Sequence, residues 1–192
     1  MTIVKPDYLN LRKEKLEKEN RKFVLRLKKR PPPGIDEEIV ECDEKVFSQI
    51  SCLSCANCCK TISPVFKDRD ITRIAAHFKM RPAIFTDKYL YLDEDEDYVL
   101  KTVPCPFLNT DNSCSIYDQR PHACRSYPHT ATLPFTKSSE LFIRNSAVCP
   151  AVYEIVSMLK KKYSWRISPD EINQTPVTAL CWFNYFRFCL WH

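Results

Sequence analysis

The feature that most constrains this chain is a run of four cysteines within eight residues, Cys52-Leu53-Ser54-Cys55-Ala56-Asn57-Cys58-Cys59. A single cysteine commonly packs as a small hydrophobic residue, but packing gives no reason for spacings of three, three and one. Gaps of two residues let a tight turn aim successive thiolates at one metal ion. The run therefore predicts a metal-binding loop, and the rest of the chain is interpreted as its scaffold.

The spacing is compatible with more than one metal. Cys52, Cys55 and Cys58 have the two-residue gaps of the first three ligands in a bacterial ferredoxin loop, and the pairs Cys105-Pro106 and Cys149-Pro150 resemble the Cys-Pro pair of a remote cluster ligand. Zinc is equally satisfied by four thiolates, in sites built from a tight pair and a distant pair. Zinc, iron and an iron–sulfur cluster therefore stay open.

The adjacent residues Cys58 and Cys59 also leave the number of centres open. Two neighbouring residues of an ordinary backbone cannot readily aim both sulfurs at one ion. They either serve different sites, or one of them is a nearby spare thiol. We expect Asn57 to supply any left-handed conformation that the turn needs, because asparagine tolerates it.

Composition narrows the class of protein. The chain starts with Met1-Thr2-Ile3-Val4-Lys5-Pro6 and continues highly charged, so eleven cysteines without an apolar signal segment predict a cytosolic, thiol-reducing location. No run of about eighteen apolar residues predicts a membrane span. Gly34 is the single glycine, which excludes the common glycine-rich nucleotide-binding loops.

Residues 1–30 are strongly basic, with eleven Lys/Arg against four Asp/Glu. Apolar residues from Tyr8 to Leu27 recur at mostly helical intervals and predict an amphipathic helix, which Pro31-Pro32-Pro33-Gly34 ends. Such a basic arm can contact a protein or an anionic partner. A solvated helix face is favoured over nucleic acid, because no base-reading motif accompanies the charge.

The remaining chain predicts an α+β fold: a small, mainly helical single domain with short strands and loops around a cysteine metal cluster. We expect a basic helical arm at 1–30, a linker and lead-in at 31–47, a cysteine-cluster metal-binding domain at 48–163, and an aromatic C-terminal tail at 164–192 whose role the sequence does not define. Helical periodicity predicts helices after Asp70 and after Arg81-Pro82.

The later cysteines lie beside turn and strand signals. Tyr98 to Val103 alternates and predicts a strand, and the polar turn at 109–113 allows Cys105 and Cys114 to face one another across a hairpin-like loop. Pro121 permits a helical turn that carries His122, Cys124 and Arg125. Leu141-Phe142-Ile143 predicts a further short strand, and Cys149-Pro150 opens an apolar-striped helix.

Taken together, these separated motifs resemble the YkgJ-like CxxCxxCC family of zinc- or iron-chelating cysteine-cluster proteins. The motifs are the CxxCxxCC run, Cys105-Pro-Phe-Leu, Cys114-Ser-Ile-Tyr, Arg120-Pro121 with Cys124-Arg125, and Cys149-Pro150. The resemblance covers roughly residues 48 to 160. Related cysteine patterns in flagellin lysine N-methylases would imply an iron–sulfur cofactor. Many family members carry glycine at the position of Ala56.

The resemblance implies a metal site made of eight cysteines: Cys52, Cys55, Cys58, Cys59, Cys105, Cys114, Cys124 and Cys149. Cys42, Cys181 and Cys189 match nothing in the family pattern and are interpreted as ordinary thiols. Arg120 and Arg125 do match it. Four thiolates around a divalent ion leave about two negative charges, which guanidinium N–H groups can neutralise; the alternative for both arginines is a surface position.

Two classes of function follow. The first is a cytosolic metal-binding protein in which zinc or iron, held by the cysteine thiolates, organises a small core. The alternative is an iron–sulfur-dependent enzyme for redox chemistry or protein methyl transfer. No Ser/His/Asp order and no HExxH motif supports hydrolysis, so the sequence predicts metal binding and leaves catalysis open.

Overall fold

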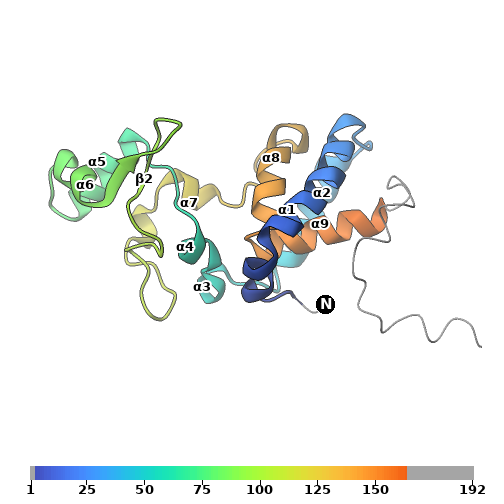
Figure 1. Ribbon diagram of the computed structural model, residues 1–192, viewed down its shortest axis with the longest axis horizontal. Helices are drawn as coiled ribbons and strands as arrows, with labels where there is room; N and C mark the ends of the chain where they lie inside the picture. Colours follow the sequence, from blue (N-terminus) through green and yellow to red (C-terminus); the bar gives the residue numbers. More distant parts are fainter. Residues whose placement is uncertain (1–2, 164–192) are drawn as a thin grey trace, which may run out of the picture.

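The computed structural model describes residues 3–163, which form a mainly helical fold with two short strands (Figure 1). The elements, in order, are α1 (Pro6–Lys29), α2 (Ile35–Phe47), α3 (Cys52–Cys55), α4 (Asn57–Thr61), α5 (Asp68–His77), α6 (Pro82–Tyr89), β1 (Leu90–Leu92), β2 (Tyr98–Leu100), η1 (Tyr117–Gln119), α7 (His122–Ser126), α8 (Phe135–Ser146) and α9 (Pro150–Lys162).

Four of the longer helices, α1, α2, α8 and α9, pack together and form what we call the helical lobe, on the right of Figure 1. Its core takes Val24 and Leu27 from α1, Ile39 from α2, Ile143 from α8 and Ile155 from α9, all at most 2% exposed. Each helix contributes an apolar stripe at helical spacing, so the lobe forms because these stripes can be buried only against one another.

A second group of elements, α5, α6, β1 and β2, forms the small lobe, on the left of Figure 1. The two strands are antiparallel and pair Leu90 with Leu100 and Leu92 with Tyr98. Its core is aromatic: the rings of Phe85 and Phe107 stack with centroids 6.2 Å apart. Because an isolated two-stranded hairpin is marginal in water, this packing against α5 and α6 stabilises the strands.

The cysteine-bearing elements α3, α4 and α7 lie between the two lobes (Figure 1). The chain runs from the helical lobe through α3 and α4 into the small lobe, and it returns through η1 and α7 to α8. The cysteine segments therefore occupy the junction where the two lobes are joined.

Most elements follow the sequence prediction, with two corrections. The prediction of a strand at Leu141–Ile143 is wrong, because these residues lie in the middle of α8, where Phe142 and Ile143 point into the helical core. Three apolar residues in a row fit a strand or a buried helix equally well. The expected lead-in at 31–47 contains a full helix, α2, which starts directly after Gly34 in a left-handed conformation with φ 72°.

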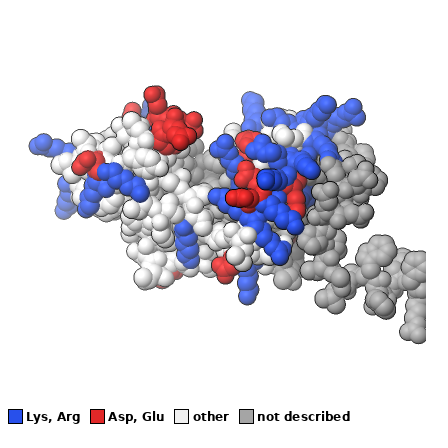
Figure 2. Space-filling view, in the orientation of Figure 1, with Lys and Arg blue, Asp and Glu red and all other residues white. Residues whose placement is uncertain are grey.

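The predicted amphipathic helix in the basic arm is confirmed as α1. Phe23, Val24 and Leu27 of its apolar stripe are buried in the helical core, and Leu9 and Leu16 are buried in a smaller cluster with Ala147. Asn20 donates a hydrogen bond of 2.8 Å to the hydroxyl of Ser146 in α8. Figure 2 shows the opposite face, where Lys and Arg side chains gather with acidic side chains among them. The proposed division of the chain at Pro31 stays a prediction, although α1 packs as part of the lobe.

Among residues 3–163, none of the helices has both the length and the apolar character that crossing a membrane requires. The expected aromatic tail at 164–192 lies outside the described residues.

Candidate metal centre

The cysteine run forms two short helical turns, α3 and α4, that meet at Ala56. Ala56 is buried and has a left-handed conformation with φ 48°, which favours glycine because an alanine Cβ is crowded there. The family's glycine at this position therefore has a physical reason. The expectation that Asn57 supplies the left-handed residue is wrong, because Asn57 begins α4.

Asn57 instead anchors the loop to the helical lobe. Its side chain is 3% exposed, and its Nδ2 donates a hydrogen bond of 2.7 Å to the carbonyl oxygen of Val148, next to Cys149. The same amide exchanges hydrogen bonds of 3.1 and 3.2 Å with Asn10 of α1. These bonds hold the loop against α1 and against the segment between α8 and α9.

Four of the eight cysteines, which we call the first group, line one cavity of about 30 Å³: Cys52, Cys55, Cys58 and Cys149. This volume holds about one or two water-sized particles. Tyr127 also lines the cavity, and its hydroxyl oxygen is buried without a hydrogen-bond partner among the described residues. The pKa of Tyr127 is raised, first by burial and then by the nearby thiols of Cys149 and Cys58.

Cys149 connects the first group to the helical lobe, against whose core it packs. It stands at the N-cap of α9, where the main-chain N–H groups of Ala151 and Val152 act to lower its pKa. Burial nevertheless raises the pKa of Cys149 to about 12. Since the N–H donors favour the thiolate and burial opposes it, a bound cation would supply the charge that the site lacks.

The other four cysteines, which we call the second group, are close electrostatic neighbours of one another: Cys59, Cys105, Cys114 and Cys124. Burial is the main cause that raises the pKa of Cys124 to about 12, and the thiols of Cys59, Cys105 and Cys114 raise it further. The pKa of Cys105 is likewise raised, to about 11. Near neutral pH the thiols of Cys105 and Cys124 are protonated unless a cation compensates their charge.

Cys105 and Cys114 are placed by a hairpin-like loop, as the sequence predicts. Leu108 and Cys114 form an isolated antiparallel bridge, and both cysteines pack against the aromatic core of the small lobe. The main-chain N–H groups of Phe107 and Leu108 oppose the rise in the pKa of Cys105. The loop therefore presents both thiols from the small lobe beside Cys59 of the cysteine run.

The two groups meet at the adjacent residues Cys58 and Cys59. The interaction between their thiols raises the pKa of Cys58 and is the main cause that lowers the pKa of Cys59 to about 7; nearby Arg120 lowers the pKa of Cys59 further. Cys59 is therefore the thiol of this pair that more readily becomes a thiolate.

The two arginines of the family pattern lie in different environments. Arg120 is partly buried, its guanidinium carbon lies 3.5 Å from the ring centroid of Tyr117, and its charge opposes the rise in the pKa of Cys114 and Cys124. Arg125 is exposed on α7. The contacts therefore favour Arg120, rather than Arg125, as the cation beside the thiols.

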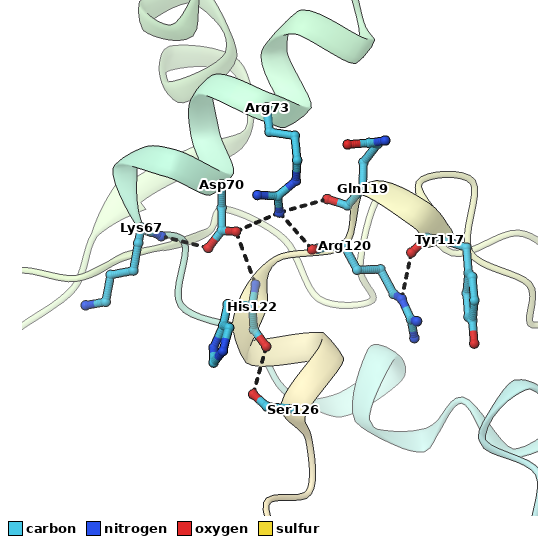
Figure 3. A network of polar contacts seen from close by, with 8 residues as sticks. All are labelled: Lys67, Asp70, Arg73, Tyr117, Gln119, Arg120, His122 and Ser126. Atoms are coloured by element: carbon cyan, nitrogen blue, oxygen red, sulfur yellow. Dashed lines mark hydrogen bonds and ion pairs between the residues drawn. The ribbon is translucent and has the colours of Figure 1, made fainter. Parts of the chain in front are cut away.

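An ion pair between Arg73 and the buried carboxylate of Asp70 positions the segment that carries Arg120 and Cys124 (Figure 3). Asp70 of α5 is 3% exposed. Its carboxylate accepts a hydrogen bond of 2.7 Å from the guanidinium of Arg73 and one of 3.2 Å from the main-chain N–H of His122. Arg73 in turn donates a hydrogen bond of 2.9 Å to the carbonyl oxygen of Arg120. The sequence assigned only helix capping to Asp70, which it provides by accepting from the N–H of Lys67.

The residues fit a thiophilic metal by donor chemistry, because eight thiols, main-chain N–H donors and an arginine gather at one junction. Within residues 3–163, no three Cys, His, Asp or Glu side chains already surround a common metal position. The sulfurs are thus neighbours that would have to close on an ion, rather than a finished coordination sphere.

Comparison with known proteins agrees with this donor set. Residues 51–150, more than half of the chain, match a family model described as "CxxCxxCC: Putative zinc- or iron-chelating domain". The chain belongs to the CxxCxxCC family. No curated protein and no solved structure matches it. The matched range starts just before the cysteine run and ends just after Cys149, so it spans all eight proposed ligands of this CxxCxxCC protein.

Of the three cysteines outside the family pattern, the structure describes Cys42, which lies away from this site. Cys42 is buried in the core of the helical lobe, as its interpretation as an ordinary thiol implies. Cys181 and Cys189 lie outside the described residues. The sequence does not indicate the place of Tyr127 in the cavity or the anchoring role of Asn57, because both depend on contacts with distant segments of the chain.

Proposed function

We propose that this CxxCxxCC protein chelates zinc or iron through the thiolates of its eight family cysteines, in the cytosol. The observation that supports it best is the meeting of four separate chain segments at one junction: the 52–59 run, the 105–114 loop, α7 with Cys124, and the N-cap of α9 at Cys149. Thiol packing alone gives no reason to bring all eight together, whereas metal binding does.

The metal would act on structure in the first place. The ligands come from the junction of two lobes whose cores are separate, so a metal–thiolate site would tie them together. Structural zinc contributes about 10 kcal/mol to folding, which is comparable to the net stability of a domain. The alternative, an iron–sulfur-dependent enzyme, stays a prediction on which no finding bears.

The test is the metal content of the protein purified without oxygen. We expect zinc or iron in stoichiometric amount by elemental analysis, and removal of the metal with a chelator should increase cleavage by a protease. Visible absorption would identify an iron–sulfur cluster, because zinc thiolates have a filled d shell and no such transitions. Purified full-length protein that holds no zinc or iron and folds equally well with a chelator would refute the proposal.

A further inference from the structure

We infer that the eight cysteines form two adjacent four-sulfur centres that divide between Cys58 and Cys59. The first centre takes the first group, Cys52, Cys55, Cys58 and Cys149; the second centre takes the second group, Cys59, Cys105, Cys114 and Cys124. The inference rests on the proposed function, because it assigns the same thiolates to separate sites.

Coordination number is the first step of the argument. Structural zinc takes four ligands in a tetrahedron, and [2Fe–2S] and [4Fe–4S] clusters are each held by four cysteines. Eight sulfurs therefore exceed what any of these centres uses, whichever metal is bound. Two centres of four sulfurs each account for the whole set without a spare thiol.

Geometry selects the members of the first centre. Its four cysteines line one cavity, and none of the second group lines that cavity. Tyr127 directs a hydroxyl with no partner among the described residues into the same space. An orphan donor beside four sulfurs fits a place where thiolates carry negative charge, because it can donate a hydrogen bond to a sulfur there.

The members of the second centre are linked through the chain as well as through space. The main-chain N–H of Cys105 donates 2.9 Å to the carbonyl oxygen of Cys59, and Cys114 returns beside Cys105 through the bridge with Leu108. The Asp70–Arg73 pair fixes the entry to α7, which carries Cys124.

Each centre then joins the cysteine run to a different lobe. Cys149 packs against the core of the helical lobe, whereas Cys105 and Cys114 pack against the core of the small lobe. The first centre fastens α3 and Cys58 of α4 to the helical lobe, and the second fastens Cys59 of α4 to the small lobe. The peptide bond between Cys58 and Cys59 is the covalent link between the two sites.

The experiment compares Cys149→Ser and Cys105→Ser in the full-length protein, with Cys42→Ser as the matched control. Metal is measured by elemental analysis and by native mass spectrometry, counted as ions or as clusters. We expect two equivalents in the unchanged protein and in Cys42→Ser, one in each single variant, and none in the variant with both changes. Limited proteolysis should cleave the small lobe in Cys105→Ser and should leave it intact in Cys149→Ser.

Two results would overturn the inference: a single metal equivalent in the unchanged protein, or loss of both equivalents in a well-folded single variant. Cys55→Ser and Cys114→Ser repeat the comparison if either first variant does not fold, and the stoichiometry of the unchanged protein decides without any variant. Unchanged protein without zinc or iron would instead refute the proposed function, so the two failures are distinguishable.

Discussion

The main-chain N–H of Cys105 donates a hydrogen bond of 2.9 Å to the carbonyl oxygen of Cys59. The bond joins the end of the cysteine run to the start of the hairpin-like loop. In the sequence, the elements α5, α6, β1 and β2 of the small lobe lie between these two segments. The bond holds two proposed ligands side by side through the backbone, so their approach does not depend on the metal. A bound ion would then have to close only the remaining distances between side chains.

The hydroxyl of Tyr127 gives a prediction whose sign depends on the metal. A buried hydroxyl without a partner costs about 1 to 3 kcal/mol, so Tyr127→Phe should stabilise the metal-free protein by about 1 kcal/mol. In the metal-loaded protein the hydroxyl can donate to a thiolate, and the same change should lower stability or metal affinity. Thermal unfolding with metal and with a chelator measures both effects.

Tyr91→Phe is the matched control, because the Tyr91 side chain is 50% exposed on β1. Tyr91→Phe should leave the stability of the metal-free protein and of the metal-loaded protein unchanged. Equal effects of Tyr127→Phe with and without metal would show that this hydroxyl does not act on the centre.

The packing of α1 predicts that the basic arm contributes to stability. Leu27 is 1% exposed in the helical core, whereas Leu11 of the same helix is 86% exposed. Leu27→Ala should therefore lower the free energy of unfolding by about 2 to 5 kcal/mol, and Leu11→Ala should leave it nearly unchanged. Denaturant unfolding of the two variants measures the difference.

Deletion of residues 1–30 extends this test to the division proposed from the sequence. A dispensable arm would leave the metal content unchanged. The amide pair between Asn10 and Asn57 and the buried Leu27 lead us to expect a less stable protein that holds metal more weakly. A truncated chain that is as stable and as metal-loaded as the full chain would support the division at Pro31.

Local patterns carried most of what the sequence predicted correctly. The helix around Leu16 and Phe23, the proline-started α6 and the helix after Cys149 depend on periodicity and on proline, which are properties of neighbouring residues. The family motifs proposed the set of eight cysteines, which stays a prediction. Leu141 to Ile143 was misassigned because burial in α8, not local preference, decides its conformation.

The arrangement of the site depends on contacts between distant segments, which a single sequence does not reveal. Nothing local in Asn57 indicates that it bonds to Val148, and nothing in Asp70 indicates that it holds the N–H of His122. Backbone geometry alone left open whether Cys58 and Cys59 serve different sites. The partners that we propose for them depend on the fold, which places Cys149 and Cys105 against the cores of different lobes.

The buried thiols predict a strong pH dependence of metal binding. The pKa is raised to about 11 at Cys105 and to about 12 at Cys149, so both thiols hold their protons near neutral pH without metal. Binding must displace these protons. As the pH is lowered, the affinity for the metal should fall by about tenfold per pH unit for each proton released. Competition with a chelator between about pH 6 and about pH 8 would measure this dependence.

The metal-free protein should respond to pH in its stability as well. A folded-state pKa above the ordinary value of 9.0 means that the folded protein binds the proton more tightly than the unfolded chain. This contribution is fully present below about pH 9 and is lost as the pH rises toward about 11 to 12. Metal affinity that does not change with pH would contradict thiolate ligation.

The contrast between the two arginines gives a paired prediction. Arg120 is a charged neighbour of Cys59 and Cys114, so Arg120→Gln should weaken metal binding through the loss of a compensating positive charge. Arg125→Gln, at an exposed position on α7, should have a much smaller effect. Chelator competition on both variants measures this, and equal losses would show that the exposed arginine also serves the site.

The buried carboxylate of Asp70 gives the last prediction, because it acts on the second centre without touching a sulfur. Asp70→Asn removes the negative charge of the carboxylate to which Arg73 and the N–H of His122 both donate hydrogen bonds. A hydrogen bond to a charged group contributes about 1.5 to 3 kcal/mol to stability. We expect unfolding at lower denaturant and selective loss of the metal held with Cys124. Asp68→Asn, in the same first turn of α5 but exposed, is the control and should keep both equivalents. A stable Asp70→Asn protein with full metal content would show that the ion pair does not position α7.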